Sequence, residues 1–184
     1  MRIRGNKLKA ALERAEMTVD RAAEALAEPG FAKDDAARAI RNWMAGRDHP
    51  RCRASRLKKL AGVLKVDVKD LAAFTSEVRY HRGSPRKAAL LATLIRGKNV
   101  DQALNLLAFT TKRAAVNMRK CLSAAVSDAE QAECDVTRLY VSESRVDYAA
   151  VMKRFQPKDR GRAHPILKPL SHITISVEER PSRG

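Results

Sequence analysis

Residues 152–174 constrain the fold of this chain more than any other stretch of its sequence. Six residues of the stretch are Lys or Arg, and one, Asp159, is acidic. The basic residues surround Pro157 and Gly161, which are turn formers. Beyond them, apolar side chains alternate as in a strand with one buried face: Ile173, Ile175 and Val177. We therefore predict a long β-hairpin with a cationic tip, which adds little to a core but can carry positive charge into a polyanion.

The whole chain is basic. Its 184 residues include 37 Lys plus Arg and 21 Asp plus Glu, a formal net charge of +16. Self-repulsion destabilises such a compact chain unless a partner neutralises it, so nucleic acid is the leading partner. An anionic membrane surface ranks second, because an aromatic content of 4% provides few interfacial anchors. Hydrophobic residues make up 45% of the chain, enough for the core of one or two domains.

Several classes of protein are excluded by what the sequence lacks. Cys52, Cys121 and Cys134 are odd in number and form no C-x-x-C pair, which favours reduced, buried thiols over disulfides or a zinc site. No apolar run approaches the roughly 20 residues of a membrane span, and the basic N-terminus is not a signal peptide. No Walker-type loop, H-E-x-x-H or G-x-S-x-G motif is present. We expect a cytoplasmic protein that is not an enzyme and holds no metal or cofactor.

The pattern changes near residue 75. Residues 1–75 have helical periodicity throughout, with Thr18 as a candidate N-cap. Residues 76–184 begin with an extended piece, continue in helices and end in alternating strands. The first part holds 17 basic and 10 acidic residues (+7), and the second holds 20 and 11 (+9). We therefore predict two domains, 1–75 and 76–184.

Three pieces of the first part carry a resemblance. They are Thr18 with Ala22 and Ala23, the stretch AIRNWMAGR at 39–47, and RLKKLAGVLKVDVKDLAAF at 56–74. The region resembles the helix-turn-helix domain of the phage-repressor type, which implies an all-α domain of five helices. In that family the helix before the W-x-x-G element enters the major groove. The resemblance implies that four residues contact nucleic acid: Arg38, Arg41, Asn42 and Arg47.

Two departures weaken groove docking. The turn at residues 28–33 is several residues longer than the family's, and Met44 stands where the family usually has Glu. The alternative interpretation is that Ile40, Trp43 and Leu60 are simply core and that the arginines of this helix form a solvated face.

The second part begins with an extended piece at residues 77–82. A helix follows, with Ser84 as N-cap and Pro85 at its first position, and Gly97 ends it. A short helix around residues 100–107 and a long one over residues 111–131 come next. Tyr140 and Tyr148 then fall in an alternating strand, where we expect them to pack along the hairpin base.

Three long pieces of this part carry a second, more specific resemblance. They are SPRKAALLATLIRGK (84–98), QALNLLAFTTKRAAVNMRKCLSAA (102–125) and MKRFQPKDRGRAHPILKPLSHIT (152–174). They closely resemble the large-subunit ribosomal protein twenty-two family. The resemblance implies an α+β fold in which three helices pack on a three-stranded antiparallel sheet, with a long protruding hairpin at about 139–177. It also implies a structural constituent of the large subunit that binds 23S rRNA, aids assembly and lines the polypeptide exit tunnel. Its partners would be that RNA, neighbouring ribosomal proteins and, transiently, the nascent polypeptide.

Carried over by position, the resemblance assigns two sets of residues. The predicted rRNA contacts are Arg79, His81, Arg82, Ser84, Arg86, Lys87, Lys112, Arg113, Lys153, Arg154, Lys158, Arg160, Arg162, Lys168, Ser171 and His172. The predicted tunnel tip is Phe155, Gln156, Pro157, Lys158, Asp159, Arg160, Gly161 and Arg162. Arg offers phosphate a planar fork and Lys a point charge. Phe155 could stack on a base or brace the tip, and His172 could contact RNA or be a structural hydrogen-bonder.

Two departures from this family fall in the hairpin. Ala149 and Ala150 stand where the family commonly has Gly-Pro, and Pro169 with Leu170 where it has Arg-Thr. Because proline cannot donate to a ladder, we expect Pro169 at an edge or a bulge. The alternative function is a DNA-binding regulator that uses the helix-turn-helix. A combined interpretation makes residues 1–75 an extension on the ribosome surface.

Overall fold

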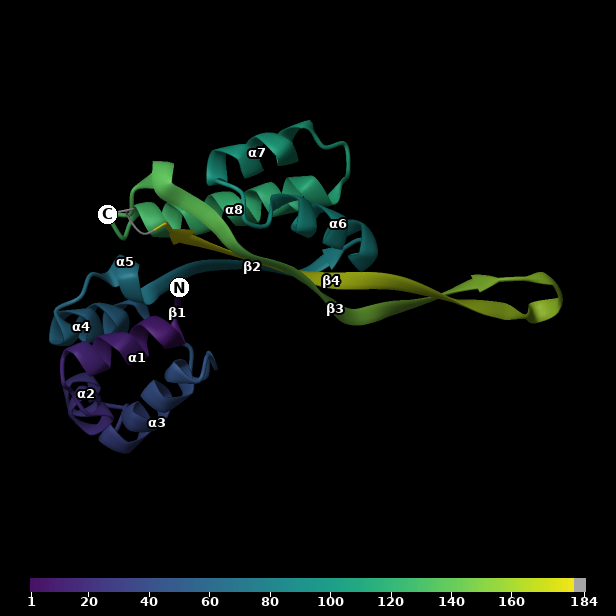
Figure 1. The fold of residues 1–184 in the computed structure, drawn as a ribbon. Helices are drawn as coiled ribbons and strands as arrows, with labels where there is room; N and C mark the ends of the chain where they lie inside the picture. Colours follow the sequence, from purple (N-terminus) through teal and green to yellow (C-terminus); the bar gives the residue numbers. More distant parts are fainter. Residues whose placement is uncertain (181–184) are drawn as a thin grey trace. The chain divides into compact units, whose positions relative to one another are not determined.

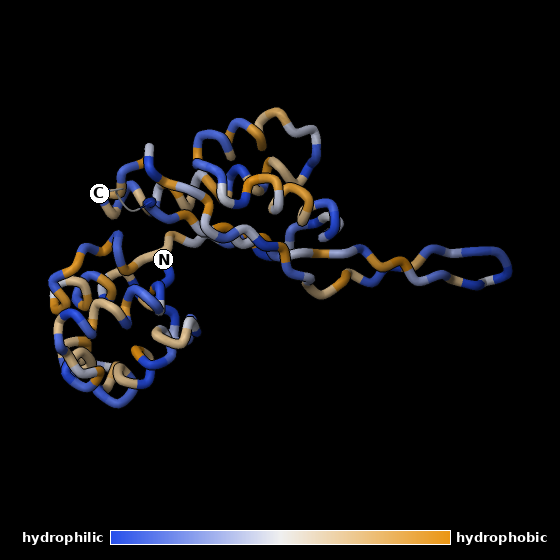
Figure 2. The backbone as a smooth tube through the Cα atoms, viewed as in Figure 1, coloured by the Kyte–Doolittle hydropathy of each residue, from blue (hydrophilic) through white to orange (hydrophobic). Residues whose placement is uncertain are grey.

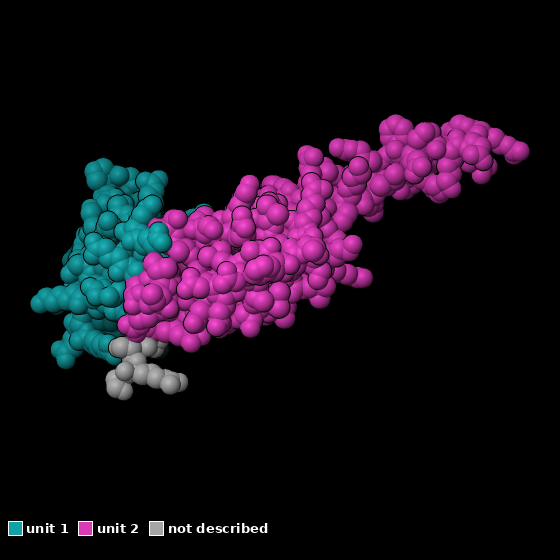
Figure 3. All heavy atoms as spheres, turned by 90° about the horizontal axis from the view of Figure 1, so that it is seen from above, with its two compact units in different colours: residues 1–74, 128–134 teal, residues 75–127, 135–184 magenta. Residues whose placement is uncertain are grey.

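The computed structural model describes residues 1–180, which separate into two units (Figures 1 and 3). The first unit comprises residues 1–74 together with residues 128–134. The second comprises residues 75–127 and resumes at residue 135. The chain therefore returns to its first unit once, near the end of its longest helix.

Helices make up most of the first unit. They are α1 (Gly5–Arg14), α2 (Val19–Leu26), α3 (Lys33–Met44), α4 (Ala54–Leu64) and α5 (Val68–Leu71). A two-residue strand, β1 (Arg2–Ile3), pairs antiparallel with the start of β2 (Ala72–Arg82). The prediction of helix throughout residues 1–75 is therefore wrong at its two ends, where β1 and the start of β2 are strands. Only two residues of each strand pair with the other, which is too few for an alternating pattern to be recognised in the sequence.

The helices form where the sequence pattern predicts them. The Thr18 hydroxyl caps α2 by accepting the Arg21 N–H at 3.5 Å, as its position predicts. The apolar stripes of the helices meet in one core, whose fully buried side chains include Leu8, Leu26, Ile40, Trp43, Leu57, Leu60 and Leu71. The interpretation of Ile40, Trp43 and Leu60 as core residues is confirmed.

The long turn between α2 and α3 has a structure of its own. Glu28 and Phe31 exchange two backbone hydrogen bonds of 3.1 and 2.8 Å around Pro29 and Gly30. Gly30 has a φ of +86°. A type II turn requires such a positive φ at its third residue, and proline is common at its second. The Arg56 guanidinium lies 3.7 Å from the Phe31 ring centroid, so the turn packs on α4.

In the second unit, three long strands lie side by side. The strand order of the whole sheet is β1-β2-β4-β3, with β3 at Leu139–Pro157 and β4 at Ala163–Glu179. The expected three-stranded sheet therefore gains a fourth strand, β1. Thr75 lies opposite Ser176, with 2.7 Å between their hydroxyls, and the Tyr80 N–H lies opposite His172, so β2 runs antiparallel to β4.

Three helices lie on one face of these strands (Figure 1): α6 (Pro85–Ile95), α7 (Val100–Phe109) and α8 (Ala114–Glu130). Pro85 occupies the first turn of α6, as predicted. The core between helices and strands consists of fully or nearly fully buried side chains, among them Ala88, Leu91, Ile95, Leu107, Met118, Leu122, Leu139, Val141, Ile173, Ile175 and Val177. This unit is an α+β fold.

The strands β3 and β4 form the predicted hairpin, which η1 (Val136–Arg138) precedes and η2 (Asp159–Gly161) closes. Their register shifts twice, between Val141 and Glu143 and between Ala149 and Met152. The second shift sets two residues of β3 opposite Pro169 alone, because Ala149 pairs with Leu170 and Met152 with Lys168. The expectation of a bulge at Pro169 is confirmed. Figure 2 shows that the tip beyond the bulge is hydrophilic.

Candidate nucleic-acid interface

The outer part of the hairpin, residues 152–168, has no core of its own. Its side chains are exposed except for Met152 and Ile166, which are half-buried. The chain turns through Arg160 and Gly161, both with positive φ, of 55° and 70°. The Lys158 N–H donates to the Arg162 carbonyl at 2.7 Å and closes the tip. Backbone hydrogen bonds hold this ribbon, and all of its basic side chains are exposed.

The cations of the outer hairpin have no acidic partners. The six basic residues of the stretch form no salt bridge with any residue in the described range, 1–180. Within the part of the chain that the structure describes, one of these side chains makes a hydrogen bond: the Arg154 guanidinium donates to the neighbouring Lys153 carbonyl at 2.7 Å. Phe155 is 75% exposed, so it does not brace the tip against the arms. An unpaired cation in water keeps its full capacity to bind phosphate.

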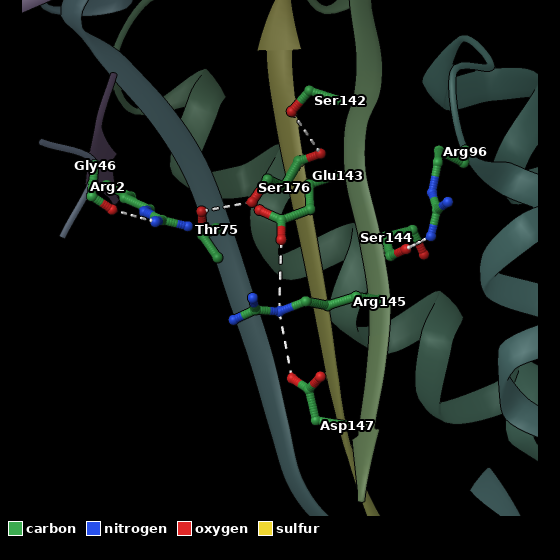
Figure 4. A network of polar contacts seen from close by, with 10 residues as sticks. All are labelled: Arg2, Gly46, Thr75, Arg96, Ser142, Glu143, Ser144, Arg145, Asp147 and Ser176. Atoms are coloured by element: carbon green, nitrogen blue, oxygen red, sulfur yellow. Dashed lines mark hydrogen bonds and ion pairs between the residues drawn. The ribbon is translucent and has the colours of Figure 1, made fainter. Parts of the chain in front are cut away.

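In the inner part of the hairpin, residues 139–149 paired with 170–179, charged side chains are paired. Figure 4 shows Arg145 between two carboxylates on its own strand, 3.5 Å from Glu143 and 3.3 Å from Asp147. The guanidinium of Arg96, the residue that follows α6, donates to the Ser144 carbonyl, and the Ser142 hydroxyl donates to the Ser176 carbonyl at 3.3 Å. Charge is balanced here and the strands are tied to a helix.

A second group of exposed cations lies where β2 ends and α6 and α8 begin. The helix α8 runs along β2, since Asn117 contacts His81 at 2.7 Å and the Cys121 thiol donates to the Ser76 carbonyl at 3.2 Å. This pairing brings residues before α8 close to the end of β2. The exposed basic side chains there are Arg79, Arg82, Arg86, Lys87, Lys112 and Arg113. Of these, Arg79 is paired with Glu77 at 3.1 Å.

Two predicted RNA contacts are buried in the structure. His81 is 5% exposed and hydrogen-bonded to Asn117, and Ser171 is fully buried. Tyr80 has a positive φ of 55°, which breaks the alternation of β2 and turns His81 into the core. Ser171 lies on β4, which has a strand on each side and helices above. The structure therefore does not expose either side chain, and their contact with RNA stays a prediction.

The imidazole of His81 fits tightly into its place. Burial, and then the nearby Arg113 charge, lower the pKa of His81 below its ordinary value. A Cβ on Gly83 would lie 2.6 Å from the imidazole Nε2, so a glycine is needed there. These contacts make His81 a structural residue that joins β2 to α8.

His172, the second histidine predicted to contact RNA, and the two tyrosines expected to pack along the hairpin base lie in different surroundings. His172 is half-buried, accepts the Tyr80 N–H at 3.3 Å and stands edge-on to its ring, which fits the structural alternative. Tyr140 is half-buried beside the Arg180 guanidinium, 5.3 Å from the ring centroid. Tyr148 is 73% exposed, so the expectation that it packs along the base is wrong.

In the first unit, three of the four predicted nucleic-acid contacts are already engaged with other residues of the unit. Arg38 lies 3.9 Å from Asp35, and Arg41 lies 3.6 Å from Asp20. The Asn42 side chain donates to the His49 carbonyl at 2.9 Å. Arg47, also predicted, lies beyond α3 with an exposed side chain and no salt bridge within residues 1–180. The geometry does not gather these four side chains on one free helix face.

One residue of the outer hairpin was missed by the sequence interpretation. His164 is exposed and pairs with Gln156 next to the tip. Its position inside the basic stretch was the signal that could have identified it.

The described residues hold no group of His, Cys, Asp and Glu side chains that could bind a metal ion. No helix among them is long and apolar enough to cross a bilayer. Burial raises the pKa of Cys52 to about 11 and also raises that of Cys121, which leaves both thiols protonated and unreactive near neutral pH. All three cysteines are buried, and none forms a disulfide bond within the described residues.

Comparisons with known proteins agree with the geometry of the second unit. Residues 76–178 match the family model described as ribosomal protein L22p/L17e. The "Large ribosomal subunit protein uL22" of Syntrophotalea carbinolica is 43% identical over 106 residues, which are 57% of this chain and 96% of that protein. The protein of the same name from Thermotoga sp. (strain RQ2) is 44% identical over 126 residues, 68% of this chain and 76% of that protein. Because the family match spans more than half of the sequence and contains all but the last residue of the hairpin, this chain belongs to the ribosomal protein L22p/L17e family.

Proposed function

We propose that this protein is a structural constituent of the large ribosomal subunit. It binds 23S rRNA through the exposed cations of the second unit, aids subunit assembly and lines the polypeptide exit tunnel with its hairpin tip. Its partners are that rRNA, neighbouring ribosomal proteins and, transiently, the nascent chain. The names of its relatives and its family membership support a place in the large subunit, and hence in the cytoplasm.

The observation that carries the proposal is the exposed, unpaired outer hairpin. A two-stranded ribbon without a hydrophobic face is marginally stable in water by itself. Segments of this kind gain stability when a partner surrounds them. The cations Lys158, Arg160 and Arg162 at its tip fit a polyanion, and the exposed Phe155 ring is free to stack on a base.

The second cationic group supports binding at the base of the hairpin. Arg86 and Lys87 lie in the first turn of α6, where backbone N–H groups also attract anions. The half-buried Ser84 hydroxyl makes no capping hydrogen bond within that helix, so it is free to donate to a phosphate. RNA helices are bound mostly through their backbone and shape, because their deep groove excludes side chains. A surface of separate cations suits that mode of binding.

Sedimentation tests this function. The tagged protein should co-sediment with large subunits in stoichiometric amount through a high-salt gradient. A photo-reactive residue in place of Phe155 should crosslink to rRNA within those subunits. Recovery of the protein only in the free pool would refute the proposal. Incorporation without a crosslink from position 155 would refute the placement of the tip.

The first unit is proposed to be a helix-turn-helix-like extension that is dispensable for incorporation. Deleting residues 1–71 keeps β2 whole, and the truncated protein should still enter subunits. Its stability should fall, because residues 128–134 lose the unit with which they group. Absence of the truncated protein from subunits would show that the extension is required.

The alternative function, a DNA-binding regulator, depends on base reading by α3. Sequence-specific duplex binding that is lost in Arg41→Ala/Asn42→Ala would favour it. The ion pair of Arg41 and the hydrogen bond of Asn42 within the unit weigh against it.

A further inference from the structure

The link between α3 and α4 carries unpaired charge. Residues 47–53, RDHPRCR, hold three arginines and one acid, Asp48. We call this stretch the cationic link. The side chains of Arg47, Arg51 and Arg53 are all exposed. None of the three forms a salt bridge with another residue in the range 1–180.

The cationic link is held in place by side chains that reach its backbone. The Asn42 amide donates to the His49 carbonyl at 2.9 Å, and the Trp43 indole donates to the Pro50 carbonyl at 2.8 Å. The Arg2 guanidinium fixes the residue before the link by donating to the Gly46 carbonyl at 2.7 Å (Figure 4). Because the backbone is fixed before any partner arrives, less conformational entropy is lost on binding.

Burial within the link directs its arginines outward. Cys52 is 7% exposed, and its thiol donates to the Arg53 carbonyl at 3.5 Å. Its two neighbours, Arg51 and Arg53, are exposed, and Arg53 has extended backbone angles. Alternation in extended backbone places these two arginines on the side opposite the buried thiol. The three arginines lie within seven residues, a span of at most about 25 Å.

Around α2 and α3, in contrast to the link, several basic side chains are paired with acidic ones. Four cations in this region are paired with acids: Arg38 with Asp35, Arg41 with Asp20, Lys33 with Glu24, and Lys59 of α4 with Glu28. These pairs are exposed and individually weak, but their carboxylates repel an approaching polyanion. The link offers cations without that competition.

We propose that the cationic link, rather than α3, is the nucleic-acid-binding surface of the first unit, and that it binds the phosphate backbone of double-helical RNA without reading bases. Arg47, Arg51 and Arg53 supply planar forks that match phosphate oxygens. Contacts with phosphate carry no sequence information, so sequence discrimination is not expected. The phosphate-binding surface rests on the geometry of the first unit alone. The choice of RNA rests on the proposed function.

Photo-crosslinking of the full-length protein tests the proposal. A benzophenone amino acid replaces His49, whose exposed side chain lies inside the link, and in a second protein it replaces Glu13, which is exposed on α1. Each protein is irradiated with a 20-base-pair RNA duplex, with the DNA duplex of the same sequence, and with a second RNA sequence. We expect the crosslink yield with RNA to be about tenfold higher from position 49 than from position 13. We also expect equal yields for the two RNA sequences.

Two charge-matched variants identify the cause. Arg47→Gln/Arg51→Gln/Arg53→Gln should lower the yield from position 49 about tenfold. Lys7→Gln/Lys9→Gln/Arg14→Gln removes the same charge from exposed positions of α1 and should leave the yield unchanged. Circular dichroism should show that both variants keep the wild-type fold.

Three outcomes would overturn the proposal. Equal yields from positions 49 and 13, or equal losses in the two triple variants, would mean that net charge alone attracts RNA. A higher yield with DNA than with RNA would overturn the choice of RNA. Because purified protein and a model duplex are used, these outcomes do not depend on incorporation into subunits, which tests the proposed function separately.

Discussion

The inner and outer parts of the hairpin are the same two strands in two different environments. The inner part, residues 139–149 paired with 170–179, buries Leu139, Val141, Ile173, Ile175 and Val177 against helices. The outer part, residues 152–168, buries no side chain. The boundary between them is the bulge opposite Pro169. Hydrogen-bonded pairing thus continues far beyond the core, while the stabilisation from apolar burial stops at the bulge.

The charges follow the same boundary. Inside it, Arg145 is balanced by two carboxylates, and outside it the cations are bare. The inner part therefore stabilises the fold, and we propose that the outer part binds a partner. Four changes test this division.

The largest expected effect is on stability. Ile175 is fully buried in the inner part, and Ile175→Ala should lower the free energy of unfolding by about 2–5 kcal/mol. Leu167 is 59% exposed in the outer part, and Leu167→Ala should change it by no more than about 0.5 kcal/mol. Urea unfolding followed by circular dichroism measures both. Equal losses would show that the outer part also contributes a core.

The second change acts on binding and spares the fold. Lys158→Gln/Arg160→Gln/Arg162→Gln should make the slope of log affinity for RNA against log salt less negative by about 2 to 3, since each lost phosphate contact accounts for about 0.7–0.9. The unfolding free energy should stay within about 0.5 kcal/mol of the wild type. Lys7→Gln/Lys9→Gln/Arg14→Gln is the matched control. An identical change of slope in that control would remove the tip's special role.

The third change tests through pH dependence whether His81 of β2, the strand beside β4, belongs to the core that supports the inner part. Its folded-state pKa is lowered, so below pH 6.5 the unfolded chain binds the proton more readily than the folded chain. The stability from neutral His81 is therefore full above about pH 6.5 and declines as pH falls through the region below it. His81→Gln should reduce the loss of stability between pH 7 and pH 5, measured by urea unfolding at each pH. An unchanged pH dependence would mean that His81 is not held neutral in the core.

The smallest effect is expected at Tyr148, which belongs to the inner part by register but is 73% exposed. Tyr148→Ala should change the unfolding free energy by no more than about 0.5 kcal/mol. A thermal unfolding comparison with Ile175→Ala provides the scale. A loss above 1 kcal/mol would place the end of the core further along the strand than the exposure of this ring indicates.

Much of the fold could be predicted from local patterns. Alternation predicts β3 and β4, proline and glycine predict the tip, and the missing N–H of Pro169 predicts the bulge. β1 could not be predicted, because it depends on pairing with residues 72 and 73, far away in the sequence. The position of His81 could not be predicted either, because the left-handed backbone of Tyr80 that redirects it has no local signature.

The candidate site divides in the same way. The sequence by itself determined the excess positive charge, the basic stretch around a turn and the family to which the chain belongs. Tertiary structure alone decided which of these polar side chains are available: His81 and Ser171 are buried, Arg38 and Arg41 are paired with acids, and the arginines of the link are free. The physical reason is that charge and periodicity belong to the local chain, whereas burial and ion pairing depend on neighbours that only the folded chain brings together.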